Sequence, residues 1–418
     1  MPTDRPRAVC VVTGSEIVRG ERTDLNGPFL AREALRHGLE PARISIVGDD
    51  PAELEAAFGE ALEADAVFVS GGLGPTHDDR TVEIVARTLG LGTHVDAGLE
   101  REIESVARAA AQRSGRDYAE FAHGTTKQAT KPDGALSLGL AGTAPGLLLA
   151  REGDRVVVVL PGPPSELQRL WPNALASEPF RRLLARTRPP GRRAFRLFGV
   201  TESAVARALA EAGGDGDGVE ATICARDYEI HVDLLVEPDA EQAADRLEHD
   251  FIGALDRYLY GRDERTVEEH VVELCRARGL TIGTAECCTA GLVAARLASA
   301  PGAAGVAAGG LVVGTAGLAE RRLGVPAELT AEHGAASPEV AAALAQGVRR
   351  ELGVDVAIAV TELATPAGAE DGELGVVHLH AEGPDGGQGR AFTFSGDAAA
   401  IRPRAAAIAL HLVRSLLG

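Results

Sequence analysis

The sequence lacks the long apolar segments of a membrane protein and the cysteine spacing of a disulfide-rich or zinc-binding one. No apolar run reaches the roughly 18 residues that a membrane-spanning helix needs, and no charged and then apolar leader is apparent. The five cysteines are an odd number without metal-ligand spacing, which indicates reduced thiols. We therefore expect a cytoplasmic protein that does not contact a membrane.

Positive charge is scarce as well. The chain has 42 Lys and Arg against 61 Asp and Glu, a formal net charge of −19. Binding to nucleic acid or to an anionic membrane surface needs concentrated positive charge, so the excess of acidic residues disfavours both kinds of partner. A small, soluble, charged substrate is the better expectation. The 418 residues, 45% of them hydrophobic, are enough for two or three domains that each have a core.

Lysine is almost absent, and the lysines of the chain are Lys127 and Lys131. We attribute the preference for Arg to codon usage, without functional meaning. Against that background, a remaining Lys suggests a position where Arg would not serve, such as a compact point-charge contact to phosphate. We interpret Lys127 as a functional candidate, whereas Lys131 precedes Pro132 in a turn-like stretch and is the weaker one.

The most informative segment is 71–79, Gly-Gly-Leu-Gly-Pro-Thr-His-Asp-Asp, which joins a strand-like run at 65–70 to a helical pattern at 80–87. Glycines let backbone N–H groups approach an anion, and a helix start adds unpaired donors. Asp78 and Asp79 suit a phosphate only if a divalent cation lies between them. The alternative is a tight turn in which Thr76 caps the helix and Asp79 completes a capping-box-like pair. Spacing alone leaves both interpretations open.

Strand-like and helical patterns alternate through the N-terminal part. The strands are expected at 8–13, 44–48, 65–70 and 156–160, with helices at 26–36 and 51–64. Repeated βαβ units predict a parallel sheet with helices on both faces and ligands at the carboxyl ends of the strands. Three loops, 13–16, 71–79 and 161–166, follow such ends. We expect them to converge on one edge of the sheet.

Two prolines and a glycine at 189–191 break regular structure and indicate a domain boundary. We expect three domains, residues 1–188, 189–263 and 264–418. The middle segment reads as a small α+β module, with an alternating strand at 228–234 on which His231 is expected to be exposed.

The last segment begins with a helix at 267–278 and a strand at 280–284, and Cys287 and Cys288 precede a helix at 292–298. A thiol at a helix N-terminus is either an acidified nucleophile or an ordinary small apolar residue, and both interpretations stay open. The overall fold class is α/β.

These motifs together resemble the CinA family of competence and damage-inducible proteins across nearly the full chain. The N-terminal motifs that agree, in the family's order, are 13–16, Asp24 with Asn26, 47–50, 71–76 with Asp78 and Asp79, 127–129, 142–146, and 160–164 with Glu166. The resemblance implies a three-layer αβα molybdopterin-binding-like N-terminal domain and a C-terminal domain similar to nicotinamide mononucleotide deamidases. It also implies a homodimer.

For the N-terminal domain, the resemblance implies divalent-metal-dependent hydrolysis of ADP-ribose to AMP and ribose 5-phosphate, with Mg²⁺ or Co²⁺. Such a reaction needs charge neutralisation and a positioned water. We assign Asp78 and Asp79 to the metal and Lys127 to phosphate charge. Glu16 or Glu166 is assigned to the attacking water or to support of the metal. The phosphate-binding candidates are Gly71, Gly72, Gly74 and Thr76.

The C-terminal domain departs from the family pattern. Glu286, Cys288, Thr289 and Gly291 agree with its Glu-Ser-Cys-Thr-Gly-Gly signature, but Cys287 replaces the catalytic serine. Gly314 and Ala319 stand where tyrosine and lysine are expected, and the segment 361–366 is also altered. This domain contains no lysine.

A nucleophile without its base loses orders of magnitude in rate, so we predict a degenerate deamidase site. Arg402 and Arg404 of this site are expected still to bind the phosphate of a nucleotide.

Three functions therefore compete. The leading hypothesis is a metal-dependent hydrolase of ADP-ribose or a related nucleotide, with a noncatalytic C-terminal domain. The second is an active nicotinamide-nucleotide amidase that uses Cys287, which predicts ammonia release. The third is a nucleotide-binding or pterin-binding regulator without turnover.

Overall fold

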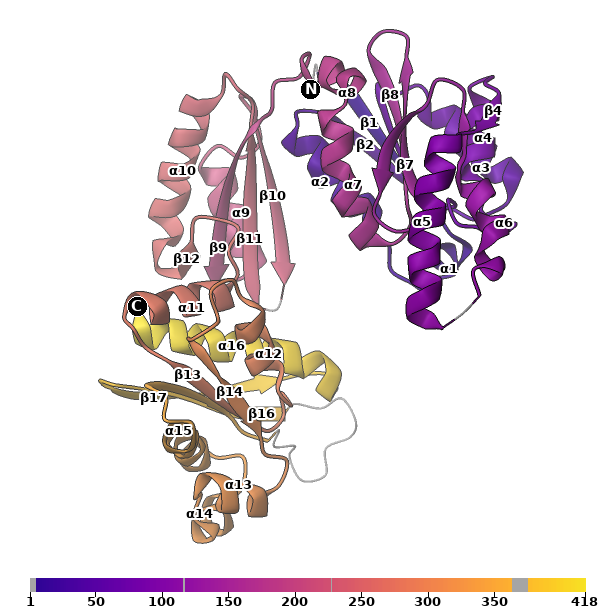
Figure 1. Ribbon diagram of the computed structural model, residues 1–418. Helices are drawn as coiled ribbons and strands as arrows, with labels where there is room; N and C mark the ends of the chain where they lie inside the picture. The colour runs from indigo at the N-terminus through magenta and orange to yellow at the C-terminus, as the bar shows by residue number, and fades with distance from the viewer. Residues whose placement is uncertain (1–4, 116, 227, 363–374) are drawn as a thin grey trace. The chain divides into compact units, whose positions relative to one another are not determined.

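The computed structural model describes residues 5–115, 117–226, 228–362 and 375–418 (Figure 1). The chain forms two compact units, residues 1–191 and 192–418. All five cysteines are free thiols. Within the described segments, no helix has both the length and the apolar character needed to cross a bilayer. Each unit combines sheets with covering helices, which confirms the α/β class.

A six-stranded sheet forms the centre of the first unit, in the order β2-β1-β3-β8-β7-β6. The strands are β1 (Arg7–Thr13), β2 (Glu40–Val47), β3 (Ala66–Ser70), β6 (Leu136–Leu140), β7 (Pro145–Arg151) and β8 (Arg155–Leu160). The first four in the order are parallel, as predicted, but β7 and β6 are antiparallel. Short turns join β6 to β7 and β7 to β8, and a parallel crossover needs a longer connection.

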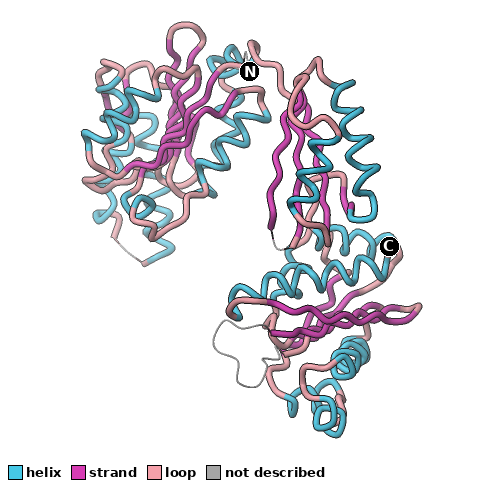
Figure 2. The backbone as a smooth tube through the Cα atoms, turned by 180° about the vertical axis from the view of Figure 1, so that it is seen from behind, coloured by secondary structure: helices cyan, strands magenta, loops and turns pink. Residues whose placement is uncertain are grey.

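Helices cover both faces of this sheet (Figure 2). One face packs against α2 (Asn26–Arg36), α7 (Pro164–Ala176) and α8 (Glu178–Leu184), and the other against α3 (Pro51–Ala61) and α4 (Thr81–Thr88). The remaining elements are α1 (Ser15–Val18), β4 (Thr93–Val95), α5 (Ala97–Ser114), α6 (Ala119–Gln128) and β5 (Thr130–Pro132). Because the inner strands are buried on both sides, β3 is apolar from Ala66 to Val69 and β8 from Val156 to Leu160. The three-layer αβα expectation is confirmed.

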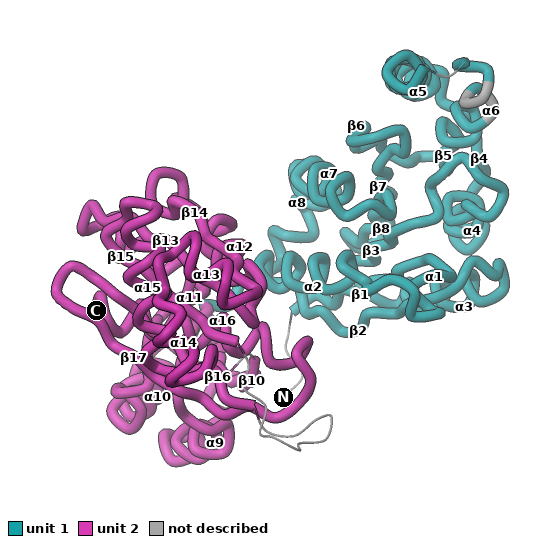
Figure 3. Tube along the Cα trace, turned by 90° about the horizontal axis from the view of Figure 1, so that it is seen from below, with its two compact units in different colours: residues 1–191 teal, residues 192–418 magenta. Residues whose placement is uncertain are grey.

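The second unit, coloured magenta in Figure 3, contains two sheets. The first has the order β10-β11-β9-β12, with β9 (Gly191–Phe198), β10 (Val219–Arg226), β11 (Glu229–Val236) and β12 (Leu259–Gly261). It shares a core with α9 (Glu202–Glu211) and α10 (Glu241–Leu255), which η1 (Asp256–Tyr258) follows. This segment thus has its own sheet and core, while the division into three domains stays a prediction.

His231 on β11 differs from expectation. Its side chain is 23% exposed and its Nε2 lies 3.0 Å from an oxygen of Glu229, so it is half-buried and partnered rather than exposed. The alternation of β11 was recognised correctly. The alternating pattern shows which face His231 lies on, but it does not show that other side chains partly cover that face.

The second sheet of this unit has the order β14-β13-β15-β16-β17, of which the first three strands are parallel. They are β13 (Ile282–Glu286), β14 (Ala307–Val312), β15 (Val356–Val360), β16 (Gly375–Gly383) and β17 (Gly386–Phe394). On one face lie α11 (Val267–Ala277), α12 (Leu292–Ser299) and α16 (Ala398–Leu417). The other face carries α13 (Ala316–Leu323) and α15 (Pro338–Leu352), with α14 (Ala327–His333) beside them.

Candidate functional site

The loop between β3 and α4 depends on two glycines. Gly71 and Gly72 have φ angles of 103° and 65°, which residues with a side chain rarely adopt. A Cβ at Gly71 would lie 2.6 Å from the carbonyl oxygen of Thr13, and one at Gly72 would overlap the hydroxyl of Thr81. The glycines therefore let this loop pass directly beside the end of β1.

Thr76 does not cap α4. The helix begins at Thr81, after an N-cap residue, Arg80, that makes no side-chain cap bond, so the capping-box interpretation is wrong. Instead, the Thr76 hydroxyl lies within hydrogen-bond distance of carboxylate oxygens of both Asp78 and Asp79. The Thr76 amide also donates to Asp79 Oδ2 at 2.9 Å. The two aspartates are thereby gathered around one hydroxyl group.

The three predicted loops do converge. They line a cavity of about 530 Å³, which we call the loop cavity, at the carboxyl ends of β1, β3 and β8. Glu16, Asp78, Asp79 and Glu166 contribute carboxylates to its lining. The three phosphate-binding glycine candidates also line it, namely Gly71, Gly72 and Gly74. The predicted edge of the sheet is thus the site of the largest collection of candidate residues.

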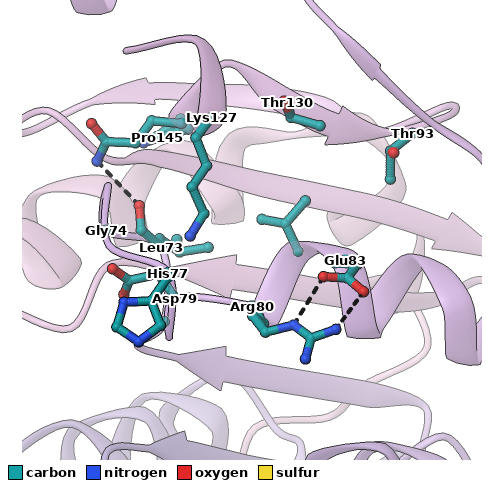
Figure 4. Close-up of a pocket in the computed structure, with 13 residues that line it drawn as sticks. Leu73, Gly74, His77, Asp79, Arg80, Glu83, Thr93, Lys127, Thr130 and Pro145 are labelled. Atoms are coloured by element: carbon teal, nitrogen blue, oxygen red, sulfur yellow. Dashed lines mark hydrogen bonds and ion pairs between the residues drawn. The ribbon is translucent and has the colours of Figure 1, made fainter. Parts of the chain in front are cut away.

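Lys127 lies at a second cavity, of about 340 Å³, on the same loop (Figure 4). Its Nζ donates to the carbonyl oxygen of Thr76, and the close-up shows its side chain extending toward the loop. Asp79 lines both cavities, whereas Glu16, Asp78 and Glu166 line the loop cavity alone. The site residues are therefore arranged around the loop rather than gathered in one pocket.

Two buried polar atoms beside the loop cavity lack partners. Thr13 Oγ1 and Asn26 Oδ1 have no hydrogen-bond partner among the described residues. The Asn26 side chain is held in place because its Nδ2 donates to Ser70 Oγ at 2.8 Å and to the Gly162 carbonyl at 2.7 Å. Buried polar atoms in native proteins are nearly always paired with protein, water or ligand. Both residues line the cavity and can offer it an acceptor.

The sequence motifs included Asn26 but gave it no role. An asparagine at the first position of a helix reads as an ordinary capping residue, and here that capping is done by Asp24, whose Oδ1 accepts from the amides of Asn26 and Gly27. In the sequence, the signal for a role of Asn26 was the nearby Asp24. Because Asp24 can cap the helix, Asn26 is not needed for that purpose.

The carboxyl groups of the loop cavity differ in their electrostatics. The Thr76 hydroxyl, with backbone hydrogen bonding, holds the pKa of Asp78 below its usual range. Burial raises the pKa of Glu166, although the nearby Arg169 offsets part of that effect. Asp78 is therefore a persistent anion suited to a cation, and Glu166 is a better proton acceptor than an ordinary carboxylate.

Asp78 and Asp79 also suit a metal of a particular kind. Among the residues that the structure describes, no group of three or more His, Cys, Asp or Glu side chains is placed to hold an ion. Mg²⁺ commonly uses one or two carboxylates and completes its shell with waters and substrate phosphates. The oxygen donors around Thr76 fit that mode of binding and do not form an all-protein cage.

Lys131 has a structural partner. Its Nζ lies 2.6 Å from Oδ2 of Asp96, and its side chain is 15% exposed. Asp96 in turn caps α5 by accepting from the amides of Gly98 and Leu99, and the ion pair and caps lower its pKa to about 2. Lys131 thus supports a helix cap.

Cys287 and Cys288 lie at another cavity, of about 400 Å³, which we call the cysteine cavity and which Gly314, Glu362 and Arg402 also help to line. Burial and the negative charges of Glu362 and Glu286 raise the pKa of the Cys287 thiol to about 12. Burial also raises that of Cys288 to about 11, partly offset by Arg402. Both groups are therefore neutral thiols near pH 7, which favours the interpretation as small apolar residues.

The other predicted deamidase positions are dispersed. Ala319 on α13 packs into the core, and Thr289 is buried with its hydroxyl unpartnered among the described residues. Arg402 donates to the Cys288 carbonyl at 2.9 Å. Arg404 instead donates to the Ser395 carbonyl at 3.4 Å, with its guanidinium over the ring of Tyr228, and does not line the cavity. Residues 363–366 of the altered loop lie outside the described residues.

The full chain has relatives of matching length. It is 39% identical over 419 residues to a CinA-like protein of Mycolicibacterium gilvum, covering 98% of each chain. It is 38% identical over 422 residues to a CinA-like protein of a Mycobacterium species, covering 98% of this chain and 99% of that one. The chain belongs to the CinA family.

The two ends of this CinA-family chain match separate family models. Residues 264–417 match the model described as "CinA C-terminal domain", and residues 9–180 match "Probable molybdopterin binding domain". A crystal structure of the protein CinA with unknown function from Thermoplasma acidophilum is 32% identical, covers 42% of this chain and 98% of that one, and has a TM-score of 0.36. The family predicted from the motifs is confirmed by the full-length relatives.

Proposed function

We propose that the N-terminal part of this CinA-family protein hydrolyses ADP-ribose, or a related nucleotide pyrophosphate, to AMP and ribose 5-phosphate with Mg²⁺ or Co²⁺. The observation that carries the proposal is the polar lining of the loop cavity. Carboxylate side chains and buried, unpartnered acceptors surround a space of about 530 Å³, within the range of small-molecule sites. The choice of ADP-ribose rests on the family resemblance.

Each residue has a separate role in the proposed hydrolysis. A divalent cation held by Asp78 and Asp79 would neutralise charge on the pyrophosphate oxygens. Glu166, with its raised pKa, accepts the proton of a water that attacks one phosphorus atom. The bond from that phosphorus to the bridging oxygen breaks, and this oxygen leaves with the other phosphate. Lys127 supplies positive charge on the other side of the loop, and Glu16 is the second candidate for the proton acceptor.

The C-terminal domain is proposed to be noncatalytic. A thiol with a pKa of about 12 supplies almost no thiolate near pH 7, and the described lining of its cavity holds neither histidine nor lysine, while the negative charge of Glu362 opposes the thiolate. A cytoplasmic location and a homodimer are further proposals that rest on the sequence. Turnover separates the leading function from that of a nucleotide-binding or pterin-binding regulator.

The test is product formation by the purified full chain. ADP-ribose and nicotinamide mononucleotide are each supplied with Mg²⁺, Co²⁺ or chelator, and AMP and ammonia are measured. We expect AMP that disappears on chelation, and no ammonia. Binding without product would favour a regulator, and ammonia that persists under chelation would make Cys287 a working nucleophile.

A further inference from the structure

A cavity in the second unit has an unusual charge. It has a volume of about 260 Å³ and lies where the end of β9 and η1 meet β17 and α16. Arg257, Arg390 and Arg414 line it, and none of its described lining residues is Asp or Glu. In a chain with a net charge of −19, this is a local concentration of positive charge. We call it the arginine cavity.

His411 offers this cavity a fixed polar atom. The side chain is 1% exposed, and its ring stacks on Phe198 with centroids 3.8 Å apart. Its Nε2 lies 2.8 Å from Glu229 Oε1, whereas its buried Nδ1 has no partner among the described residues. Glu229 itself does not line the cavity, and it also accepts from Tyr260 at 2.8 Å. The carboxylate therefore orients the ring and leaves Nδ1 for another group.

The arginines also lack ionic partners. None of the three forms a salt bridge with a described residue, and the buried Nε of Arg414 has no hydrogen-bond partner there. The guanidinium of Arg257 lies 4.6 Å from the ring centroid of Tyr258, and that of Arg414 lies 5.5 Å from that of Tyr260. Stacking holds a guanidinium in place but leaves its donors available. Arg257 and Arg390 are exposed, so water can pair with their donors, but leaving the buried Nε of Arg414 unmatched is costly unless a ligand or water pairs with it.

We propose that the arginine cavity binds a small organic anion, with a phosphate held by the arginines, a hydroxyl or amino group that donates to His411 Nδ1, and a flat apolar part against Phe392 and Leu412. Both apolar residues line the cavity together with the arginines. The volume, about half that of the loop cavity, suits a ligand of mononucleotide size better than a dinucleotide. This site is separate from the proposed hydrolytic one and does not depend on it.

Calorimetry on the full chain tests the proposal, with chelator present so that metal-dependent binding elsewhere is suppressed. The probes are AMP, inorganic phosphate and adenosine. We expect AMP to bind, phosphate to bind more weakly, and adenosine to bind weakest. Arg390 is exposed on β17, so Arg390→Gln should fold, and it should weaken AMP binding about tenfold because a charge-assisted contact is lost. Arg257→Gln should act similarly.

The matched control is Arg321→Gln on α13, an exposed arginine that does not line the cavity, which should leave AMP affinity unchanged. The double variant at 257 and 390 should weaken AMP binding more than either single one. Three results would overturn the proposal. They are no AMP binding by the wild-type chain, full affinity in the double variant, and adenosine binding as tightly as AMP.

Discussion

The loop cavity of the first unit and the cysteine cavity of the second occupy equivalent places in their folds. Each lies where parallel strands end, the loop cavity after β1, β3 and β8, and the cysteine cavity after β13 and β15. They differ in what lines them. The lining of the first includes five carboxylates and unpartnered acceptors, whereas that of the second has two neutral thiols, a glycine, and one residue of each charge, Glu362 and Arg402. Position at a strand end is thus common to both, and the two cavities differ in the side chains that line them.

Charge placement makes the contrast sharper. In the loop cavity, hydrogen bonding keeps Asp78 ionised. In the cysteine cavity, Glu286 and Glu362 act against formation of a Cys287 thiolate. Glu286 is also committed to structure, because its carboxylate accepts from the amides of Gly291, Val293 and Ala294 at the start of α12. Asp78 and Asp79 line their cavity, whereas Glu286 completes a helix end and does not line the cysteine cavity.

The largest expected effect is at Asp79, the carboxylate that lines both cavities of the first unit. Asp79→Asn removes the negative charge that we propose holds the metal, while keeping the size of the side chain. We expect metal-dependent AMP formation to fall by roughly 10²-fold or more, as when one group that stabilises transition-state charge is lost. The measurement is the initial rate over a range of Mg²⁺ concentrations.

The matched control for Asp79→Asn is Asp250→Asn, the same charge change at an exposed position on α10 of the second unit. It should keep the wild-type rate. If both variants retained full activity, Asp79 would have no part in the reaction, and the contrast between the two cavities would lose its main support.

The reactivity of the thiols tests whether Cys287 in the cysteine cavity is unreactive near pH 7. Because the pKa of Cys287 is about 12, its thiolate fraction near pH 7 is small and should rise about tenfold per pH unit up to that value. We expect iodoacetamide to label exposed Cys224 at pH 7.5 and to leave Cys287 unmodified, with labelling of Cys287 appearing only at strongly alkaline pH. Peptide mass spectrometry measures both sites in one sample. Labelling of Cys287 as fast as Cys224 at pH 7.5 would restore the amidase hypothesis.

The close passage of the glycine loop beside α4 is open to a steric test. Gly72→Ala combines a φ of 65° with an overlap of its Cβ on the Thr81 hydroxyl, whereas Gly90→Ala has a similar φ of 68° and nothing within 4 Å of its Cβ. Backbone strain alone costs about 1–3 kcal/mol, and both variants share it. We expect Gly72→Ala to lower the unfolding temperature of the first unit more than Gly90→Ala does. Equal shifts would mean that the loop yields to the extra carbon at little cost.

Most of the fold was accessible from sequence because apolar runs and glycine turns are local signals. The helix at 26–36 and the strands ending in the three loops were predicted at nearly their observed bounds. The antiparallel β6 and β7 were missed, since neither run was recognised as a strand. The side of the loop on which Lys127 lies was also inaccessible, because spacing along the chain does not say which wall of a cavity a side chain joins. For the same reason nothing marked His411, which reads as one more residue of an apolar helix until its partner Glu229 is placed.

The smallest expected effect separates the two lysines. From the sequence, Lys127 was the stronger functional candidate, because Lys131 lies in a turn-like stretch before Pro132. Lys127→Arg keeps the charge but changes its geometry next to the Thr76 carbonyl, so we expect AMP formation to fall about tenfold with little change in stability. Lys131→Arg can still reach Asp96, so activity should be unchanged and the free energy of unfolding should shift by less than about 1 kcal/mol. Rates and thermal unfolding measured side by side distinguish the two. A loss of activity in Lys131→Arg equal to that in Lys127→Arg would mean that rarity of lysine, rather than position at the loop, marks function in this chain.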